Sequence, residues 1–519
     1  MRSSPRRNLL GGAASVWIGA PSLHAVKSGR KDVADIWPKW RKFSLIGVIV
    51  ALIAAVTAQV VSVREAQAIP AFARKYDFAC NVCHVPSFPK LNDFGNLFRD
   101  HGYQLGTDQE LPTWEGLTKG YWPVSFRTTV GYQFQNKTGL LNATSGVGDV
   151  TSTSGSFGFT GLDVLSFGIL HRDISFGIVF TPALGSAGFG TSPSDGDLES
   201  AFIKLDNLQR FIGLGENNYL MNFKVGKYEL DLPFSEKRSP TLNTTFLIYH
   251  YIAGMPVVGG GLAGVTNPND FMLGENHPGA ELAGITPTAF TNGYFRYSLN
   301  ALSNSDVNKG QTGGGRAFQF YGHVTQSFGG YGVVSGQRIG LSGMAGQAPT
   351  VPNAASLAGG TGENNQPFSR AGVDASLTWL GQVNIFGTWM FAKDSQNLFL
   401  NNPNVTLVGS AQEAHWNGGF IEADYNPIQL PKWLFIYRYD WITNTQQPDS
   451  GFSLPDGRVV GNFNNTQQHT LGVRYNLHIS TRTDFALHLE YSNLRGTHTA
   501  ASGGDQRQDT MLAGLDFAF

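Results

Sequence analysis

From Pro123 to the last residue, apolar and polar positions alternate along the chain with a period of two. Phe126, Val130 and Phe134 fall on one side of this alternation, and Arg127 and Gln133 fall on the other. A strand with this pattern shows one face to an apolar environment and the other to a polar one. The pattern predicts strands at 123–135, 157–170, 174–182, 199–206, 219–229, 277–286, 290–301, 316–328, 332–344, 369–379, 383–393, 414–425, 433–444, 467–477, 483–494 and 508–519.

The connections between these strands alternate between short and long. Short ones fall at 171–173, 287–289, 329–331, 380–382, 426–432 and 478–482, and Gly/Ser/Asn-rich long ones fall at 136–156, 183–198, 230–276, 302–315, 345–368, 394–413, 445–466 and 495–507. Short periplasmic turns that alternate with long outer loops are typical of outer-membrane barrels. The exception is 207–218, a long connection where a short one is expected, and 277–286 is the weakest predicted strand. A series of soluble β-sandwiches is the alternative, but no linker-like break follows residue 122.

The composition agrees with a mostly β chain in a membrane. Charged residues make up 14%, below the ~25% of an ordinary soluble domain. Glycine is abundant and the mean hydropathy of −0.14 excludes a bundle of membrane helices. A net charge of −1 gives no reason to expect nucleic acid as a partner. We therefore expect residues 121–519 to form an antiparallel outer-membrane β-barrel of about sixteen strands, in contact with membrane lipid. The terminal Phe519 resembles the assembly signal of such barrels.

The beginning of the chain has the pattern of an export signal. The mostly apolar stretch Phe43–Val63 follows the basic stretch 39–42 and precedes Ala66-Gln67-Ala68, a small-x-small cleavage pattern. We expect residues 1–68 to be an N-terminal extension plus signal peptide, cleaved after Ala68. The alternative is an uncleaved transmembrane anchor, since the stretch is long enough to span a bilayer.

The sequence Cys80-Asn81-Val82-Cys83-His84 has the C-x-x-C-H spacing by which c-type haem is attached. Each thiol adds to one vinyl group of the porphyrin, and the adjacent histidine is the proximal ligand of the iron. The alternatives are chance, or a metal-binding or redox C-x-x-C pair. These are the only cysteines of the chain, so none remains for a structural disulfide. We expect one covalent haem c on Cys80 and Cys83, with His84 as proximal iron ligand.

The sixth iron ligand is less clearly marked. His101 is the other histidine near the motif and is the local candidate for a distal ligand. The alternative is a surface histidine beside the turn at Gly102. Lys90, a residue of the barrel wall, or an open coordination position are further options.

Residues 69–120 are too few to bury a core that is stable by itself. A covalent cross-link or a bound metal group would have to stabilise them, and the haem would supply it. The apolar residues between 91 and 98 recur at helical spacing, and Gly102 is the expected helix stop. We expect a small, mainly helical or irregular monohaem cytochrome segment. Its apolar residues expected to surround the haem are Phe72, Phe78, Phe88, Leu91, Phe94, Leu97 and Phe98.

Three tracts of this segment resemble the fused monohaem cytochrome–porins of iron-oxidising bacteria: Ala68–Arg74, Cys80–His84 and Pro89–Tyr103. The resemblance implies a small cytochrome ahead of an outer-membrane barrel, with the haem on Cys80, Cys83 and His84. It also implies electron transfer from extracellular Fe(II) to periplasmic carriers, such as a c-type cytochrome or a copper protein. The chain departs from the family at residues 75–76 and in a longer spacer from His84 to Pro89.

Two classes of function remain open. The first is electron transfer across the outer membrane, an iron:cytochrome oxidoreductase in the broad sense, with the haem segment at the periplasmic mouth or inside the lumen. Electron flow in the opposite direction is a variant of it. The second is a diffusion porin that the haem segment gates or plugs. Long loops such as 230–276 could gather or screen an extracellular donor. Glu422, Asp424 and Asp440 fall on the polar face and could bind iron, although an ordinary polar lumen also uses such residues.

Overall fold

The computed structural model describes most of the chain beyond residue 69. The described residues are 70–76, 78, 80–84, 89–105, 111–141, 148–184, 196–215, 219–242, 245–254, 257–258, 269, 271–303, 318–329, 337–349, 365–400, 406–407, 412–448, 451–453, 459–461, 463–479, 483–498 and 505–519. The predicted signal peptide and the alternative anchor lie outside these residues. None of the described helices is long and apolar enough to cross a membrane.

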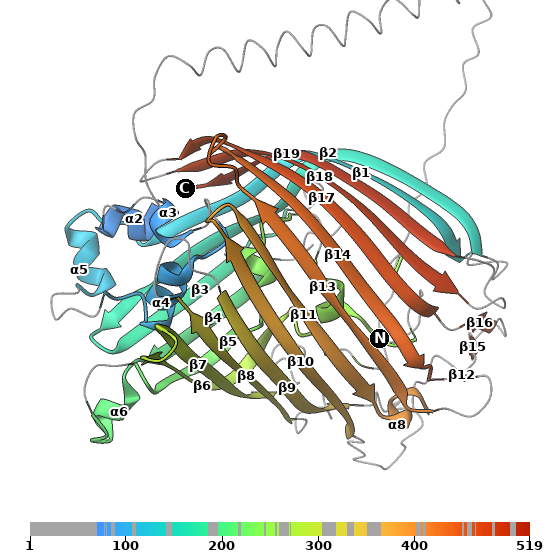
Figure 1. Ribbon diagram of the computed structural model, residues 1–519, viewed down its shortest axis with the longest axis horizontal. Helices are drawn as coiled ribbons and strands as arrows, with labels where there is room; N and C mark the ends of the chain where they lie inside the picture. The colour runs from blue at the N-terminus through green and yellow to red at the C-terminus, as the bar shows by residue number, and fades with distance from the viewer. Residues whose placement is uncertain are drawn as a thin grey trace, which may run out of the picture. The chain divides into compact units, whose positions relative to one another are not determined.

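Sixteen antiparallel strands close into one barrel (Figure 1). They are β1 (Val124–Leu141), β2 (Gly148–His171), β3 (Ile174–Thr181), β4 (Asp197–Leu205), β5 (Asn222–Glu229), β6 (Asn276–Thr288), β7 (Gly293–Ser303), β8 (Phe318–Phe328), β9 (Gln337–Pro349), β10 (Asn365–Trp379), β11 (Val383–Asp394), β13 (Ala414–Tyr425), β14 (Trp433–Gln446), β17 (Phe463–Ile479), β18 (Asp484–His498) and β19 (Gln506–Ala518). Each predicted strand overlaps one of these strands. β1 closes the barrel against β19, where the backbone N–H of Phe126 donates to the carbonyl of Phe519 at 2.7 Å. The prediction of a sixteen-stranded antiparallel barrel is confirmed.

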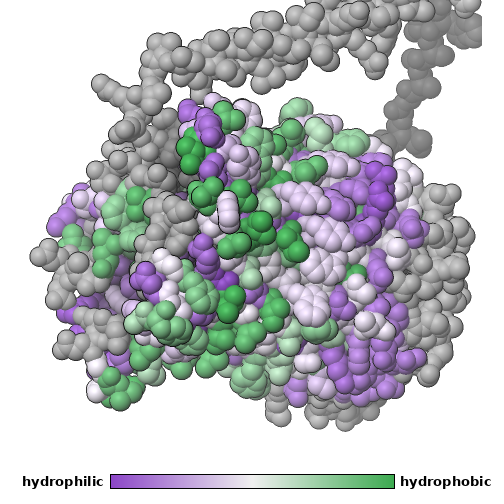
Figure 2. Space-filling model, in the orientation of Figure 1, coloured by the Kyte–Doolittle hydropathy of each residue, from purple (hydrophilic) through white to green (hydrophobic). Residues whose placement is uncertain are grey.

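The outer face of the wall is apolar, and the inner face carries polar and charged side chains together with an apolar cluster. On β8, Phe318 and Phe320 are 57% and 62% exposed, whereas the intervening Gln319 and the next residue, Tyr321, are 0% and 4% exposed. β18 repeats the pattern, with Leu487 and Leu489 exposed and the residues between them buried. Figure 2 shows the apolar residues gathered over the wall. An apolar surface of this size is stable only against lipid, and a closed barrel satisfies its backbone polar groups there. The protein is an outer-membrane β-barrel.

The two ends of the barrel differ in their connections. Short connections, such as 172–173 and 380–382, occur at the end that also holds the C-terminus, α2 (Pro70–Tyr76), α3 (Cys80–Cys83), α4 (Asp93–Asp100) and α5 (Thr113–Thr118) (Figure 1). Short turns lie on the periplasmic side of outer-membrane barrels, so this end is the periplasmic mouth. The unexpectedly long connection 206–221 contains a helix, α6 (Leu208–Phe211). At the opposite end lie α8 (Gln396–Leu400) and a small sheet of β12 (Thr406–Leu407), β15 (Gly451–Ser453) and β16 (Val459–Gly461), which the sequence pattern did not predict.

The connection between β5 and β6 joins the outer ends of these strands, as predicted, but its described residues fold into the lumen. We call residues 230–275 the lumen loop; it includes η3 (Glu236–Arg238) and α7 (Leu247–His250). α7 contacts β13 and β14, which stand halfway round the barrel from β5 and β6 in the strand order. The described part of the loop therefore crosses the lumen from one wall to the opposite one.

Apolar side chains hold the lumen loop in place. Phe246 stacks on Phe420 of β13 with ring centroids 4.0 Å apart, and Tyr251 packs edge-on against Trp416. Burying each such side chain contributes roughly 1.5–3 kcal/mol, which offsets the entropy lost in ordering the loop. In the core that they form, Leu230, Leu232, Phe246, Ile248, Tyr249, Tyr251, Phe271 and Leu273 of the loop pack on inward-facing wall residues such as Tyr228, Tyr321, Met344, Phe368, Phe386, Met390, Trp416, Phe420 and Ile442.

Candidate functional site

The C-x-x-C-H sequence forms the short helix α3 and the turn that follows it, and α4 packs directly against both. The backbone N–H of Asn92 donates to the carbonyl of Cys83 at 2.9 Å. Its side chain caps α4 by accepting from the N–H of Gly95 at 2.9 Å. Gly95 lies so close to α3 that a Cβ atom there would be 2.2 Å from the Cys83 carbonyl oxygen. Glycine at this position therefore sets the distance between α3 and α4.

His84 is buried, with only 1% of its surface exposed. Its Nδ1 lies 3.2 Å from the carbonyl oxygen of Lys90. Because a carbonyl can only accept, Nδ1 carries the proton and Nε2 carries the lone pair. Burial lowers the pKa of His84 to about 4, so the ring is neutral at neutral pH. A neutral imidazole with Nδ1–H held by a backbone carbonyl is the usual state of a metal-ligating histidine.

The two cysteines stand at the two ends of α3. Cys83 is buried and is not in a disulfide. A C-x-x-C pair followed at once by a buried neutral histidine matches the donor set of a c-type haem.

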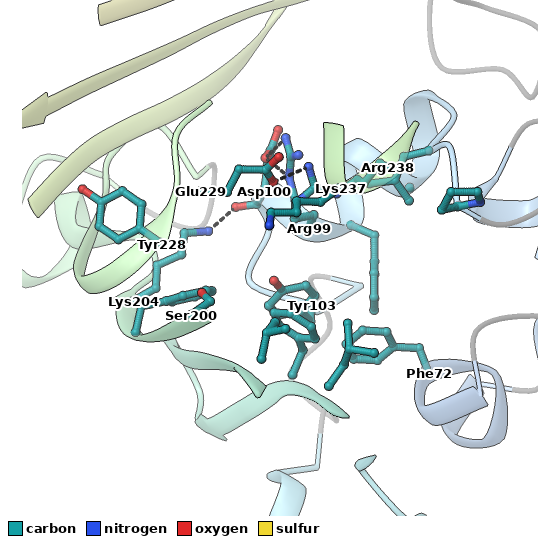
Figure 3. Close-up of a pocket in the computed structure, with 18 of the residues that line it drawn as sticks. Phe72, Arg99, Asp100, Tyr103, Ser200, Lys204, Tyr228, Glu229, Lys237 and Arg238 are labelled. Carbon is teal, nitrogen blue, oxygen red and sulfur yellow. Dashed lines mark hydrogen bonds and ion pairs between the residues drawn. The ribbon is translucent and has the colours of Figure 1, made fainter. Parts of the chain in front are cut away.

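His84 and Cys83 line a cavity of about 290 Å³ between the N-terminal segment and the barrel wall, which we call the mouth cavity. Its volume is close to the lower end of the range of about 300–1,000 Å³ typical of small-molecule sites. Phe72 and Tyr103 form one side of it, stacked with centroids 5.2 Å apart (Figure 3). The cavity thus has an aromatic side and is lined by Cys83 and His84.

The residues predicted to surround the haem divide into two groups. Phe72, Phe78, Leu91 and Phe98 line the mouth cavity. Phe94 packs instead against Phe78, with centroids 6.0 Å apart, and Leu97 packs on a cluster formed by Tyr219, Ile285 and Tyr294. Phe88 lies outside the described residues. The helical spacing placed α4 correctly, but it did not show which of its faces lies toward the cavity.

The structure places the two local candidates for the sixth ligand elsewhere. His101 follows α4 and stacks on Tyr219, with ring centroids 4.0 Å apart, and it is not among the residues that line the mouth cavity. The ammonium of Lys90 forms an ion pair with Asp424 of β13 and donates to Asn384 at 2.7 Å. His84 and His101 are therefore not brought together across the described cavity, and the amine of Lys90 is held at the barrel wall.

A cluster of ion pairs joins α4, the lumen loop and the wall. Arg296 of β7 contacts Asp100 at 2.6 Å and Asp231 at 3.0 Å, and Arg99 contacts Asp231 at 3.6 Å. Burial would raise the pKa of Asp231, but Arg296, His323 and Arg99 hold it well below its usual value. These carboxylates therefore stay ionised. Sequence alternation could not reveal the cluster, because its members come from three separate parts of the chain.

The three lumen carboxylates predicted from alternation do face the lumen and are buried. Asp440 accepts from Arg438 at 2.8 Å, and Glu422 lies 3.5 Å from the same guanidinium. Asp424 is paired with Lys90. Within the described part of the chain, no group of three or more His, Cys, Asp or Glu residues is placed to hold a metal ion. The three carboxylates thus balance buried cations.

Comparison with known proteins yields no match among protein-family models or curated proteins. Among solved structures, the anion-selective porin from Comamonas acidovorans is similar over 76% of this chain and 99% of its own, at 15% identity and a TM-score of 0.46. The outer-membrane channel DcaP of Acinetobacter baumannii is similar over 76% and 97%, at 11% identity and a TM-score of 0.44. OprB of Pseudomonas putida is similar over 78% and 96%, at 12% identity and a TM-score of 0.42. At these values the three structures add nothing to what the strand order of the barrel establishes.

Proposed function

We propose that this outer-membrane barrel is an electron-transfer protein with one covalent haem c on Cys80 and Cys83 and with His84 as proximal ligand. The observation that carries the proposal is the state of His84, which is buried, neutral and oriented by the Lys90 carbonyl beside a cavity at the mouth of the barrel. When bound, a haem supplies one-electron redox chemistry at its iron.

The residues around the mouth cavity suit this role. Phe72, Phe98 and Phe167 reduce contact with water on one side of it. The ion pairs of Asp100 and Lys90 with the wall fix the segment inside the periplasmic mouth. A carrier in the periplasm, such as a c-type cytochrome or a copper protein, would therefore exchange electrons with a site held at its own side of the membrane.

We further propose extracellular Fe(II) as the electron donor, as the resemblance of the cysteine tract implies. Iron oxidised inside the cell would precipitate as ferric solid, so a site that takes the electron and leaves the metal outside has a chemical advantage. One haem cannot span a hydrocarbon layer of ~30 Å. The packed core of the lumen loop extends from Phe386, near the inner end of β11, to Trp416, near the outer end of β13. Electrons from outside would have to cross this packed region.

A diffusion channel is the second candidate. A closed barrel of sixteen strands with a polar inner face has the size and polarity of a solute channel. The lumen loop opposes this function in its simplest form, because its described part crosses the lumen and packs on the far wall. A channel would need the loop to move or to leave a passage beside it.

One pair of measurements on the purified full-length protein separates the candidates. The first is the absorbance spectrum, taken on two samples. One sample is extracted with acid acetone to test whether the pigment is covalently bound, and a native sample is treated with Fe(II) and then with dithionite to test its reduction. The second is the conductance in planar bilayers of the natural chain and of a variant in which residues 233–273 are replaced by a short Gly-Ser linker.

Electron transfer predicts a haem spectrum that resists extraction, reduction by both reagents, low conductance of the natural chain and high conductance of the shortened variant. A haem that only dithionite reduces would contradict Fe(II) as donor. Loss of all pigment on extraction, or a chain without pigment, together with a large steady conductance, would contradict the electron-transfer proposal and favour the channel.

A further inference from the structure

The mouth cavity has two chemically different sides (Figure 3). Phe72 and Tyr103 lie on one side, and charged residues gather on the other, where Arg99, Lys237 and Arg238 lie with Asp100 and Glu229. A ligand that fills such a cavity should be flat and apolar over most of its area and anionic at one edge. A porphyrin with two carboxylates on one edge has this distribution.

The basic side is built mainly by the barrel. Lys237 and Arg238 belong to η3 of the lumen loop, whereas Arg99 belongs to α4 of the N-terminal segment. Arg99 is already engaged, since it contacts Asp100 at 3.0 Å and Asp231 at 3.6 Å. Two of these three cations therefore come from the loop that crosses the lumen.

Lys237 and Arg238 keep donor capacity toward the cavity. Arg238 contacts Glu229 at 3.0 Å, and Lys237 contacts Glu199 at 3.3 Å. The Arg238 side chain is 32% exposed and the Lys237 side chain is 42% exposed, and both residues line the mouth cavity. A guanidinium has five N–H donors and an ammonium has three, so one carboxylate partner leaves further donors on each.

The charge of Arg238 also reaches the proposed iron ligand. Arg238, His84 and Tyr103 all line the mouth cavity, so the guanidinium lies in the same cavity as the proposed ligand. A positive charge within reach of the iron favours the reduced state, because reduction adds one electron to the site.

We propose, on the basis of the proposed function, that Lys237 and Arg238 of the lumen loop bind the haem carboxylates and raise the reduction potential of the iron. The barrel then supplies the anionic-edge contacts of a haem whose covalent attachment lies in the N-terminal segment. Both are positioning residues, since they act on the cofactor through its carboxylates and through their charge.

The test is a redox titration, followed by visible absorbance, of the full-length protein and of the variants R238Q, K237Q and R238K. K119Q is the control, because Lys119 is an exposed lysine at the same end of the chain, outside the mouth cavity. We expect R238Q and K237Q each to lower the equilibrium constant for reduction by roughly threefold to tenfold, where tenfold corresponds to about 59 mV. R238K and K119Q should stay close to the natural protein.

A further variant tests the charge of Arg238 by a change that should shift the reduction potential in the opposite direction. E229Q removes the carboxylate that partly neutralises Arg238, so it should raise the potential. This variant and K237Q carry the test if R238Q does not assemble, as judged by heat-dependent migration on gels. Potentials of K237Q and E229Q equal to that of K119Q, in protein that carries haem, would overturn the inference and leave the proposed function standing. A natural chain without covalent haem would instead overturn the proposed function.

Discussion

At the scale of single residues, the geometry around His84 depends on two close contacts that involve no catalytic group. Gly95 allows α4 to approach the carbonyl of Cys83, and the Lys90 carbonyl orients the ring of His84. The ammonium of the same Lys90 holds the turn to Asp424 of the wall. Lys90 thus couples the orientation of the proposed iron ligand to the position of the whole segment.

We predict that Gly95→Ala disturbs the attachment site. The added Cβ would lie 2.2 Å from a backbone oxygen, so α3 and α4 must separate, at a cost of about 1–3 kcal/mol. The expected result is a smaller fraction of chains with covalent haem, measured as haem absorbance per protein. Gly116→Ala is the matched control, since its Cβ would have its nearest neighbour at 3.7 Å. Equal haem content in the two variants would show that α3 and α4 adapt without consequence.

We predict that Lys90→Gln loosens the N-terminal segment from the mouth. The substitution leaves Asp424 without its cation in a nearly buried position, at a cost between that of exposed and of fully buried pairs, about 1–3 kcal/mol. The segment should then be cut faster by a protease added from the periplasmic side. K90Q/D424N should be cut more slowly than K90Q, and K432Q, an exposed lysine at the same mouth, should behave as the natural chain. Unchanged cleavage in K90Q would mean that the ion pair does not hold the segment.

At the scale of elements, the strands were predictable and the filling of the barrel was not. A period of two is a local property, and β8 shows it over its whole length, and β18 from Asp484 to Tyr491, because one face meets lipid. The course of the lumen loop depends on partners such as Phe420 and Trp416, which lie far away in sequence. The sequence therefore indicated a long connection with apolar residues but not the wall that those residues would meet.

The site divides in the same way. Cys80, Cys83 and His84 could be proposed from spacing alone, because the chemistry of attachment requires neighbours in sequence. The cations of the mouth cavity could not be proposed, because η3 reaches it only through the path of the lumen loop. Nearness in sequence also made His101 the candidate for the distal ligand, but the structure packs its ring on Tyr219.

We predict that α7 of the lumen loop responds to pH through His250. Its Nε2 lies 2.6 Å from Glu236, and although burial alone would lower the pKa of His250, Glu236 raises it above the usual value. Because the folded-state pKa is raised, the pair is fully formed below about pH 6.5 and is lost as the pH rises through the folded-state value.

The measurement is hydrogen exchange of residues 245–251 from about pH 5 to about pH 9, corrected for the intrinsic pH dependence of exchange. Protection should fall as the pH rises in the natural chain. It should be independent of pH in H250Q, which keeps a hydrogen-bond donor but cannot titrate. Protection that is equally constant in both proteins would contradict the prediction.

At the scale of the whole molecule, closure of the barrel and attachment of the cofactor rest on separate contacts. The wall closes through the pairing of β1 with β19, and its lumen core is made by the lumen loop and inward-facing wall residues. Val82 and Cys83, the residues of α3 whose burial the structure describes, do not belong to that core. The barrel should therefore be stable without any group bound in the mouth cavity.

We predict that the double variant C80S/C83S assembles in the outer membrane like the natural chain but carries no covalent pigment. Assembly is measured by membrane fractionation and by heat-dependent migration on gels, and pigment by absorbance after acid-acetone extraction. A variant that is degraded or left in the periplasm would show that the haem is required for the barrel to form.

The burial of Cys83 and His84 inside the periplasmic mouth has a consequence for biogenesis. An enzyme that joins porphyrin to thiols must handle the C-x-x-C-H sequence as an accessible peptide, and neither residue is accessible once Lys90 and Asp100 have engaged the wall. For a chain that carries the proposed haem, ligation would come first, while the polypeptide is still in the periplasm, and insertion into the membrane second. Maturation of this protein would then have a fixed order, in which the haem is attached before the barrel closes around the attachment site.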